Sequence, residues 1–190
     1  MIRVHLIASR GNVQENIESL RRITKLILKE KHEIARDWVE TAYSNYVNKQ
    51  ETSADWSKIY QLNLETIAKA DIVIAETTSN SFGVGYQVAV AVQQKKPTLL
   101  LRNESASADA FATGVVDPWV KSLSYNEDNL DKIIKDFLDE NDIATKDMRF
   151  NFFIDRKIYN YLRWSAFKTG KTKAEILREL VAKEIEDKDY

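Results

Sequence analysis

The side chains available for chemistry in this chain are carboxylates, hydroxyls and amides. The sequence has no cysteine and only two histidines, His5 and His32. Thiolate catalysis, disulfides and cysteine metal sites are therefore excluded, and little remains for a zinc centre or a Ser/His relay. Two loops of small residues stand out instead, SRG at 9–11 and SNSFGVGYQ at 79–87. Each follows an apolar run, so we expect ligand binding at these loops and no metal.

A loop of small residues between a strand and a helix lets backbone amides approach an anion. The helix start adds about half a positive charge there. A simpler interpretation, which the sequence leaves open, is that the glycines only form a tight turn. An arginine in such a loop would add charge-assisted hydrogen bonds to phosphate. The candidate phosphate-binding residues are Ser9, Arg10 and Gly11 in the first loop and Ser81, Gly83 and Gly85 in the second.

Apolar periodicity predicts strands that alternate with helices around these loops. The expected strands are residues 3–8, 71–75 and 97–101, with 32–39 as a candidate fourth. The expected helices are residues 13–30, 56–70, 85–94 and 128–138, and residues 35–60 are expected to form a loop with helical pieces. This alternation predicts an α/β fold with an open parallel sheet, helices on both faces, and ligands at the carboxyl ends of the strands.

Composition and charge divide the chain into two unequal modules. Residues 139–147 are polar and aperiodic, which predicts a linker between a domain at 1–138 and a small module at 148–190. The small module carries ten Lys/Arg against seven Asp/Glu, so its charge is +3 although the net charge of the chain is -1. No apolar run approaches the roughly 18 residues of a membrane span, and the start lacks a secretory signal pattern. Cytoplasmic residence is the expectation.

Residues 63–101, NLETIAKADIVIAETTSNSFGVGYQVAVAVQQKKPTLLL, resemble the nucleoside 2-deoxyribosyltransferase superfamily, near its 2'-deoxynucleoside 5'-monophosphate N-glycosidase branch. Order and spacing follow the family pattern over most of residues 1–138. The resemblance implies a flavodoxin-like sheet, a nucleoside or nucleotide ligand, no metal and no organic cofactor. It also implies a homodimer that completes its active sites across the interface, and phosphate contacts for the loops of Ser9 and Ser81.

Two positions depart from the family's catalytic pattern. The chain has Gln87 where the family has a nucleophilic glutamate, and Asn63 where it has a supporting aspartate. A neutral amide is a poor nucleophile, so binding without turnover is expected. Glu76 matches the glutamate of the family's ADxVxAE motif and is expected in the same cleft, where it could position a sugar hydroxyl or act as catalyst. Alternatively, Asn63 only bonds a neighbouring loop, or Gln87 is an engineered replacement of glutamate. His5, inside the first strand, is expected to be a hydrogen-bonded core residue.

Residues 148–185, MRFNFFIDRKIYNYLRWSAFKTGKTKAEILRELVAKEI, resemble a ribbon-helix-helix module. In that family two chains pair their strands into a ribbon that reads the DNA major groove. Period-two alternation turns Arg149 and Asn151 outward, and these suit guanine and adenine edges, but it also turns Phe153 outward, which does not. Lys171 and Lys173 flank the start of the second helix as a candidate phosphate clamp. A dimerisation device that never contacts DNA is the alternative.

Helix signals in the tail are clear, but its core is too small for a single chain. Asp155 can cap one helix, and Thr172 with Glu175 has the spacing of a capping box that begins a second. A module this short is not expected to be stable as a single chain. We therefore expect a homodimer or a higher homo-oligomer. Three functions remain open: a nucleotide-responsive DNA-binding regulator, an active nucleoside or nucleotide glycosidase with altered catalytic residues, and a non-catalytic assembly protein.

Overall fold

The computed structural model describes residues 1–49, 56–106, 114–142 and 151–188. Contacts divide the chain into two units, Met1–Ile143 and Ala144–Tyr190. Within the described ranges, no helix has both the length and the apolar character that a membrane crossing requires. The strands of the first unit are β1 Arg3–Ile7, β2 Glu33–Ile34, β3 Ile72–Glu76, β4 Thr98–Asn103 and β5 Val120–Tyr125. Its helices are the 3-10 helix η1 Arg10–Asn12 and the α-helices α1 Val13–Lys29, α2 Val39–Val47, α3 Trp56–Lys69, α4 Phe82–Gln93 and α6 Leu130–Asn141.

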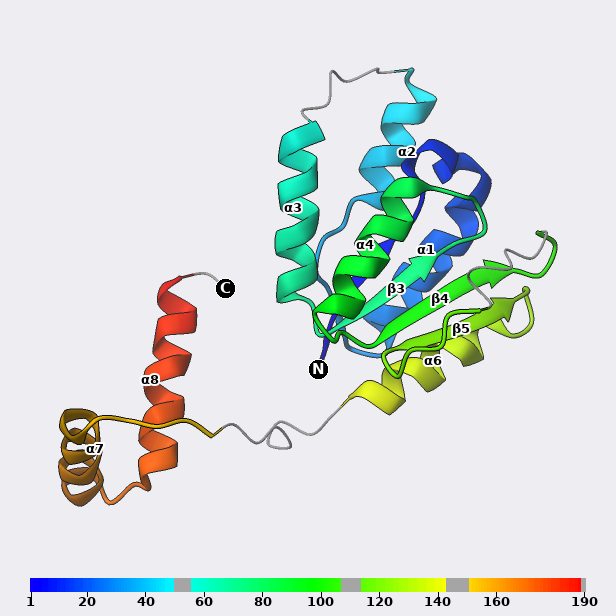
Figure 1. Ribbon diagram of the computed structural model, residues 1–190. Helices are drawn as coiled ribbons and strands as arrows, with labels where there is room; N and C mark the ends of the chain where they lie inside the picture. The colour runs from blue at the N-terminus through cyan, green and yellow to red at the C-terminus, as the bar shows by residue number, and fades with distance from the viewer. Residues whose placement is uncertain (50–55, 107–113, 143–150, 189–190) are drawn as a thin grey trace. The chain divides into compact units, whose positions relative to one another are not determined.

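The five strands form one all-parallel sheet in the order β2-β1-β3-β4-β5, flanked by helices. Helices α1, α2 and α6 pack on one face, and α3 and α4 cover the other (Figure 1). This is the Rossmann-like or flavodoxin-like α/β arrangement that the alternation predicts. The order of the strands reverses between β1 and β3, which places a crevice at the carboxyl ends of these two strands.

Alternation along the strands divides the core between the two faces. Val4 and Leu6 of β1 join the core beneath α1, whereas Ile7 joins the core beneath α3 and α4. Because side chains of like parity share a face, His5 points to the same side as Ile7. Helix α1 buries its apolar stripe as its periodicity predicts, through Val13, Ile17, Leu20, Ile23 and Ile27. The burial fixes β1 and α1, and so the loop between them.

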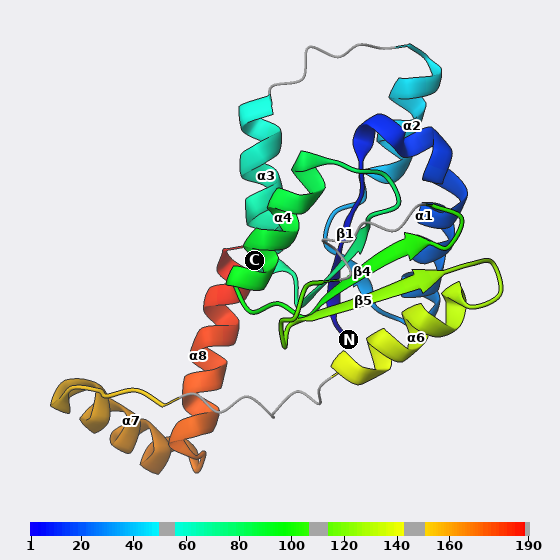
Figure 2. The same ribbon diagram turned by 45° about the vertical axis from the view of Figure 1, so that its right-hand side comes forward.

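Several element boundaries differ from the sequence prediction. Strand β5 was not predicted; it is an edge strand beside β4 whose residues are mostly partly exposed (Figure 2). Only residues 33 and 34 of the candidate strand 32–39 form a strand, and α2 begins at Val39. Helix α4 begins at Phe82 rather than at residue 85, because both glycines of the loop adopt helical backbone angles. Helix α6 extends to Asn141, three residues into the expected linker, of which 143–147 lie outside the described residues.

The second unit contains the helices α7 Arg156–Thr169 and α8 Lys173–Asp187. Asp155 caps α7, since its side chain accepts from the amide of Ile158 at 2.8 Å, and Gly170 ends the helix with a φ of 70°. Thr172 and Glu175 form a capping box at the start of α8. Both helix starts that the sequence predicted are confirmed.

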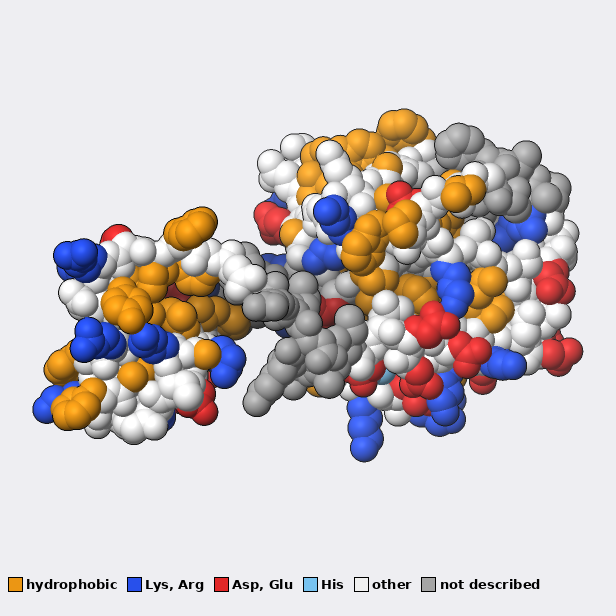
Figure 3. Space-filling model, turned by 60° about the horizontal axis from the view of Figure 1, so that its bottom comes forward, with side chains coloured by type: hydrophobic (Ala, Val, Ile, Leu, Met, Phe, Trp, Pro, Cys, Tyr) orange, Lys and Arg blue, Asp and Glu red, His pale blue; other side chains and the backbone are white. Residues whose placement is uncertain are grey.

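Residues 151–155 of the second unit form no strand within one chain, and 148–150 lie outside the described residues. The ribbon therefore remains a prediction. Leu162, Ser165 and Ile176 are buried, whereas Leu180 and Val181 are 46% and 57% exposed. Figure 3 shows hydrophobic side chains gathered on the surface of this unit. The exposed large apolar residues are Phe152, Phe153, Ile158, Tyr159, Tyr161, Trp164, Phe167, Leu180, Val181 and Ile185.

Candidate functional site

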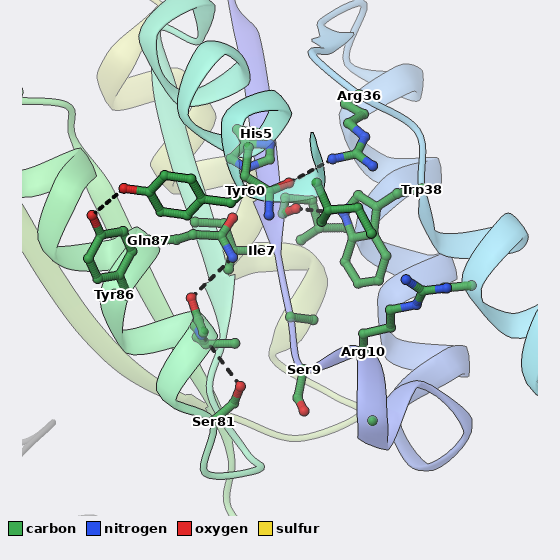
Figure 4. Close-up of a pocket in the computed structure, with 18 of the residues that line it drawn as sticks. His5, Ile7, Ser9, Arg10, Arg36, Trp38, Tyr60, Ser81, Tyr86 and Gln87 are labelled. Atoms are coloured by element: carbon green, nitrogen blue, oxygen red, sulfur yellow. Dashed lines mark hydrogen bonds between the residues drawn. The ribbon is translucent and has the colours of Figure 1, made fainter. Parts of the chain in front are cut away.

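A cavity of about 670 Å³ lies at the carboxyl end of β1, within the size range of small-molecule sites. Its walls come from β1, the loop with η1, the segment before α2, helix α3 and the first turns of α4 (Figure 4). Seven of the candidate catalytic and phosphate-binding residues line it: Ser9, Arg10, Gly11, Asn63, Ser81, Gly83 and Gln87. Gly85 and Glu76 do not line it.

The loop after β1 brings a serine and an arginine to the cavity. Ser9 is buried, and its hydroxyl lies 3.2 Å from Oδ1 of Asn12, to which it donates. Arg10 begins η1, and its guanidinium lies over the ring of Trp56, 5.8 Å from the centroid. A Cβ built on Gly11 would meet nothing within 4 Å. The loop is therefore open toward the cavity.

The second loop supplies the start of α4. Ser81 caps the helix, since its hydroxyl accepts from the amide of Val84 at 3.5 Å. A Cβ on Gly83 would meet only the Ser81 hydroxyl at 3.8 Å, and one on Gly85 would meet nothing within 4 Å. Neither glycine has a positive φ. The backbone conformation therefore does not require glycine at either position. Because Gly83 has no side chain, space remains open beside the start of α4, where the helix dipole favours anions.

The two amides at the positions of the family's carboxylates line the same cavity. Gln87 donates from Nε2 to the carbonyl of Gly83 at 3.1 Å. Asn63 accepts through Oδ1 from the guanidinium of Arg36 at 2.6 Å. Asn63 thus lines the cavity and also bonds the segment before α2, so the two interpretations of this residue are compatible. Neither side chain carries a charge that could attack an anomeric carbon.

Glu76 was expected in this cleft, but the structure places it elsewhere. It is fully buried at the end of β3, and accepts from Nδ2 of Asn16 at 3.0 Å and from the hydroxyl of Tyr125 at 3.2 Å. The amide and the hydroxyl of Thr78 also donate to it. Burial raises the pKa of Glu76 above its usual range, against these hydrogen bonds. The carboxylate holds the end of β3 against α1 and β5, so the sequence expectation of a carboxylate facing a ligand is corrected.

His5 is buried and lines the cavity, but it is not the hydrogen-bonded core residue that we expected. Within the described part of the chain, neither imidazole nitrogen has a hydrogen-bond partner of ordinary geometry. Burial lowers its pKa to about 4; the nearby amide of Gln87 opposes this shift, and the charge of Arg36 adds to it. The imidazole is therefore neutral at pH 7 and offers one donor and one acceptor at the inner end of the cavity.

Sequence reasoning did not single out Arg36, Tyr60 or Tyr86, which help to complete the walls. Trp38 is held by its indole nitrogen, which donates to the carbonyl of Leu6 at 2.9 Å. The hydroxyls of Tyr60 and Tyr86 lie 2.8 Å apart, on α3 and α4 (Figure 4). Arg36 follows β2 at the carboxyl edge of the sheet, and this placement is the signal that could have identified it. A two-residue strand is too short to reveal that edge by periodicity.

The candidate DNA contacts belong to the second unit. Asn151 is exposed, and Arg149 lies outside the described residues. The Lys171 ammonium bonds Glu179 at 2.6 Å, and Lys173 lies over the ring of Tyr159 at 4.3 Å from its centroid. Among the described residues of the chain, no His, Asp and Glu side chains cluster in a group suited to a metal ion.

Comparison with known proteins finds hydrolases of nucleotides. The chain is 33% identical over 93 residues, 48% of its length, to "Putative 2'-deoxynucleoside 5'-phosphate N-hydrolase 1" of Methanosarcina barkeri, and covers 58% of that relative. It is 30% identical over 82 residues, 42% of its length, to the 5-hydroxymethyl-dUMP N-hydrolase of Esox lucius, and covers 57% of that relative. No family model matches. These relatives support the resemblance to the deoxyribosyltransferase-like superfamily, although the chain spans less than two thirds of either.

A solved structure also aligns with the chain. The CMP N-glycosidase of Clostridium botulinum matches with a TM-score of 0.49 at 18% identity, over 69% of this chain and 97% of that chain.

Proposed function

We propose that the first unit binds a nucleoside 5'-monophosphate, or a related phosphorylated ribosyl compound, without cleaving its glycosidic bond. The observation that carries the proposal is the pair of amides, Asn63 and Gln87, which line one cavity together with the loops of Ser9 and Ser81. The relatives are named as hydrolases of 2'-deoxynucleoside 5'-phosphates and of 5-hydroxymethyl-dUMP, which supports a nucleotide as the ligand class.

Phosphate binding is supported by the start of α4 and by the first loop. The open space at Gly83 would let an anionic group approach the backbone amides at the start of α4. The Ser9 and Ser81 hydroxyls lie at the same end of the cavity (Figure 4). Hydroxyls and amides that donate to a phosphate oxygen form charge-assisted hydrogen bonds, which are stronger than neutral ones.

The lack of turnover follows from the chemistry of the lining. Among the described lining residues Asp37 is the one carboxylate, and it is exposed. Glycoside cleavage by the carboxylate mechanism needs a nucleophile or a base and a general acid. His5, with a pKa of about 4, is a weak base and is unprotonated at pH 7, so it cannot supply the acid.

A thermal-shift screen of the 2'-deoxynucleoside and ribonucleoside 5'-monophosphates tests binding, and chromatography of free base tests turnover. A ligand at 100 times its Kd should stabilise the first unit by about 2.7 kcal/mol. Gly83→Val should abolish the shift by filling the space at the helix start. Gly85→Val is the matched control, because it adds the same bulk to α4 outside the cavity. Sustained base release by the wild type would support the active glycosidase instead.

For the second unit we propose self-association and, through the paired ribbon, binding to duplex DNA, which would make the chain a ligand-responsive regulator. The exposed apolar residues of α7 and α8 support self-association, since a single chain buries too few of them. Asn151, which is exposed, and the lysines beside the start of α8 support DNA contact. Phe153, fully exposed at a position that should face bases, favours the alternative of an assembly protein.

Fluorescence anisotropy with DNA selected from a random-sequence pool separates these alternatives. Lys173→Ala should weaken binding to every sequence and flatten its salt dependence, whereas Arg149→Ala should cost about 1 to 3 kcal/mol on the selected site alone. Lys188→Ala is the control, since this lysine pairs with Glu184 at the far end of α8. Failure to enrich any sequence, with self-association intact, would favour the assembly protein.

A further inference from the structure

Two guanidinium groups line the cavity without a carboxylate partner. Arg36 makes one hydrogen bond, to the neutral Oδ1 of Asn63, and the contact of Arg10 is with the ring of Trp56. Among the described residues no ion pair involves either arginine. Asp37, the acidic residue of the lining, pairs with neither of them although it follows Arg36 in sequence.

The two positive charges act on each other. Burial lowers the pKa of Arg36 below its usual range, and the charge of Arg10 lowers it further. Like charges that face one partly buried space repel each other, and an anion between them would turn this repulsion into attraction. Elsewhere in the first unit Arg3 pairs with Glu33, Arg21 with Glu40 and Arg22 with Asp131. Arg102 bonds the hydroxyl of Ser124 and does not line the cavity.

Arg10 belongs to the loop of Ser9 and was expected to contact the 5'-phosphate, but its guanidinium lies over Trp56, apart from the hydroxyls of Ser9 and Ser81 (Figure 4). In Figure 4 the side chains of Ser9 and Ser81 lie at the lower end of the cavity, and the guanidiniums of Arg10 and Arg36 flank the Trp38 side chain on one wall. The guanidinium fork suits the paired oxygens of a phosphoryl or carboxylate group. One anionic group at each place would use both sets of donors.

We propose that Arg10 and Arg36 form a second anion-binding site, so that the preferred ligand is a ribosyl compound with two separated anionic groups. This inference rests on the proposed function, because it places the first anionic group at Ser9 and Ser81. Nucleoside 3',5'-bisphosphates have this chemistry, and so do ribosyl 5-phosphates with a pyrophosphate on the anomeric carbon. A simple 5'-monophosphate would leave the Arg10–Arg36 site unfilled.

Calorimetric titration of the full chain with matched ligand pairs tests the proposal. One pair is ribose 5-phosphate and 5-phosphoribosyl 1-pyrophosphate; the others are the four 2'-deoxynucleoside 5'-monophosphates and their 3',5'-bisphosphates. The second anionic group should raise affinity by about tenfold or more in at least one pair, as charged hydrogen bonds typically do. Which pair shows the gain identifies the source of the second anion.

Variants at the second site should remove the gain in affinity that the second anionic group gives within a pair. Arg36→Gln can still donate to Asn63 but lacks the charge, and Arg10→Gln removes the other charge. Arg36→Lys keeps a charge without the fork and should retain part of the gain. Arg22→Gln, which removes an arginine paired outside the cavity, is the control and should keep the whole gain. Circular dichroism of each variant verifies folding.

The outcomes separate this inference from the function beneath it. Equal affinity within every pair, with the single phosphate bound, would overturn the second site and leave the nucleotide proposal standing. A gain that persists in both Arg36→Gln and Arg10→Gln would also overturn the site. If no member of any pair binds, both proposals fail.

Discussion

Replacement of Glu76 should affect the stability of the first unit rather than its chemistry. In Glu76→Ala, four donors lose a buried acceptor: Nδ2 of Asn16, the amide and the hydroxyl of Thr78, and the hydroxyl of Tyr125. A buried donor without a partner costs about 1 to 3 kcal/mol, and the lost side chain leaves a small cavity. Because some donors can turn toward other acceptors, we expect a loss of about 3 to 5 kcal/mol.

Glu76→Gln is the matched variant for this prediction. Its amide oxygen can accept from Thr78 and Tyr125, while its amide nitrogen can donate to Asn16 once the amide of that residue turns over. It also removes a charge whose burial is unfavourable, as the raised pKa of Glu76 indicates. We expect the stability of Glu76→Gln to lie within about 1 kcal/mol of the wild type, since each buried donor keeps an acceptor.

Urea denaturation followed by tryptophan fluorescence measures both variants. Three of the four tryptophans, Trp38, Trp56 and Trp119, belong to the first unit. Ligand binding of Glu76→Gln should match that of the wild type, because Glu76 does not line the cavity. An unchanged urea midpoint in Glu76→Ala, or a loss as large in Glu76→Gln, would refute the reasoning.

Three further predictions concern His5, the surface of the second unit and a helix cap. The pKa of His5 is about 4 in the folded protein and 6.5 ordinarily, so protonation of this residue favours the unfolded state. The free energy of unfolding should therefore fall by about 3 kcal/mol in total as pH falls from 6.5 to 4. Urea denaturation at pH 7 and 4.5 should show that stability depends less on pH in His5→Phe than in the wild type. Sedimentation should show self-association of the wild type at micromolar concentration and its weakening in Phe167→Ser, whose side chain is 85% exposed in one chain; a monomeric wild type would contradict this. Thr172→Ala removes the capping box of α8 and should cost about 1 kcal/mol in thermal melts of the second unit, whereas an unchanged melt would mean that the cap adds nothing there.

The core elements could be predicted from sequence because they have strong periodicity and clear caps. The sequence pattern predicted that the apolar stripe of α1 and the apolar run of β3 are buried, and the structure buries both. Strand β5 has a polar, partly exposed sequence, VKSLSY, and only pairing with β4 makes it a strand. The sequence placed the start of α4 at residue 85, within a loop of small residues, whereas both loop glycines lie in this helix, which begins at Phe82.

The candidate site could be predicted in its loops but not in its walls. Spacing within one motif and order along parallel strands place Ser81 and Gln87 beside the loop of Ser9, as the structure does. Arg36 lines the site and bonds Asn63, which lies 27 residues away in sequence, so no local sequence pattern predicts this contact. The position of Glu76 could not be foreseen either, since its partners Asn16 and Tyr125 lie 60 and 49 residues away in sequence.

The hydrogen bond between Arg36 and Asn63 has a consequence for how this scaffold could change its use. An aspartate at position 63, as the family resemblance implies for catalytic members, would form a salt bridge with Arg36 and cancel the positive charge on that wall. The amide leaves the guanidinium charge uncompensated and available to a ligand. A carboxylate at position 63 would support a nucleophile but neutralise Arg36, whereas an amide there leaves Arg36 free to attract a second anion. One pocket could therefore not perform both functions equally well.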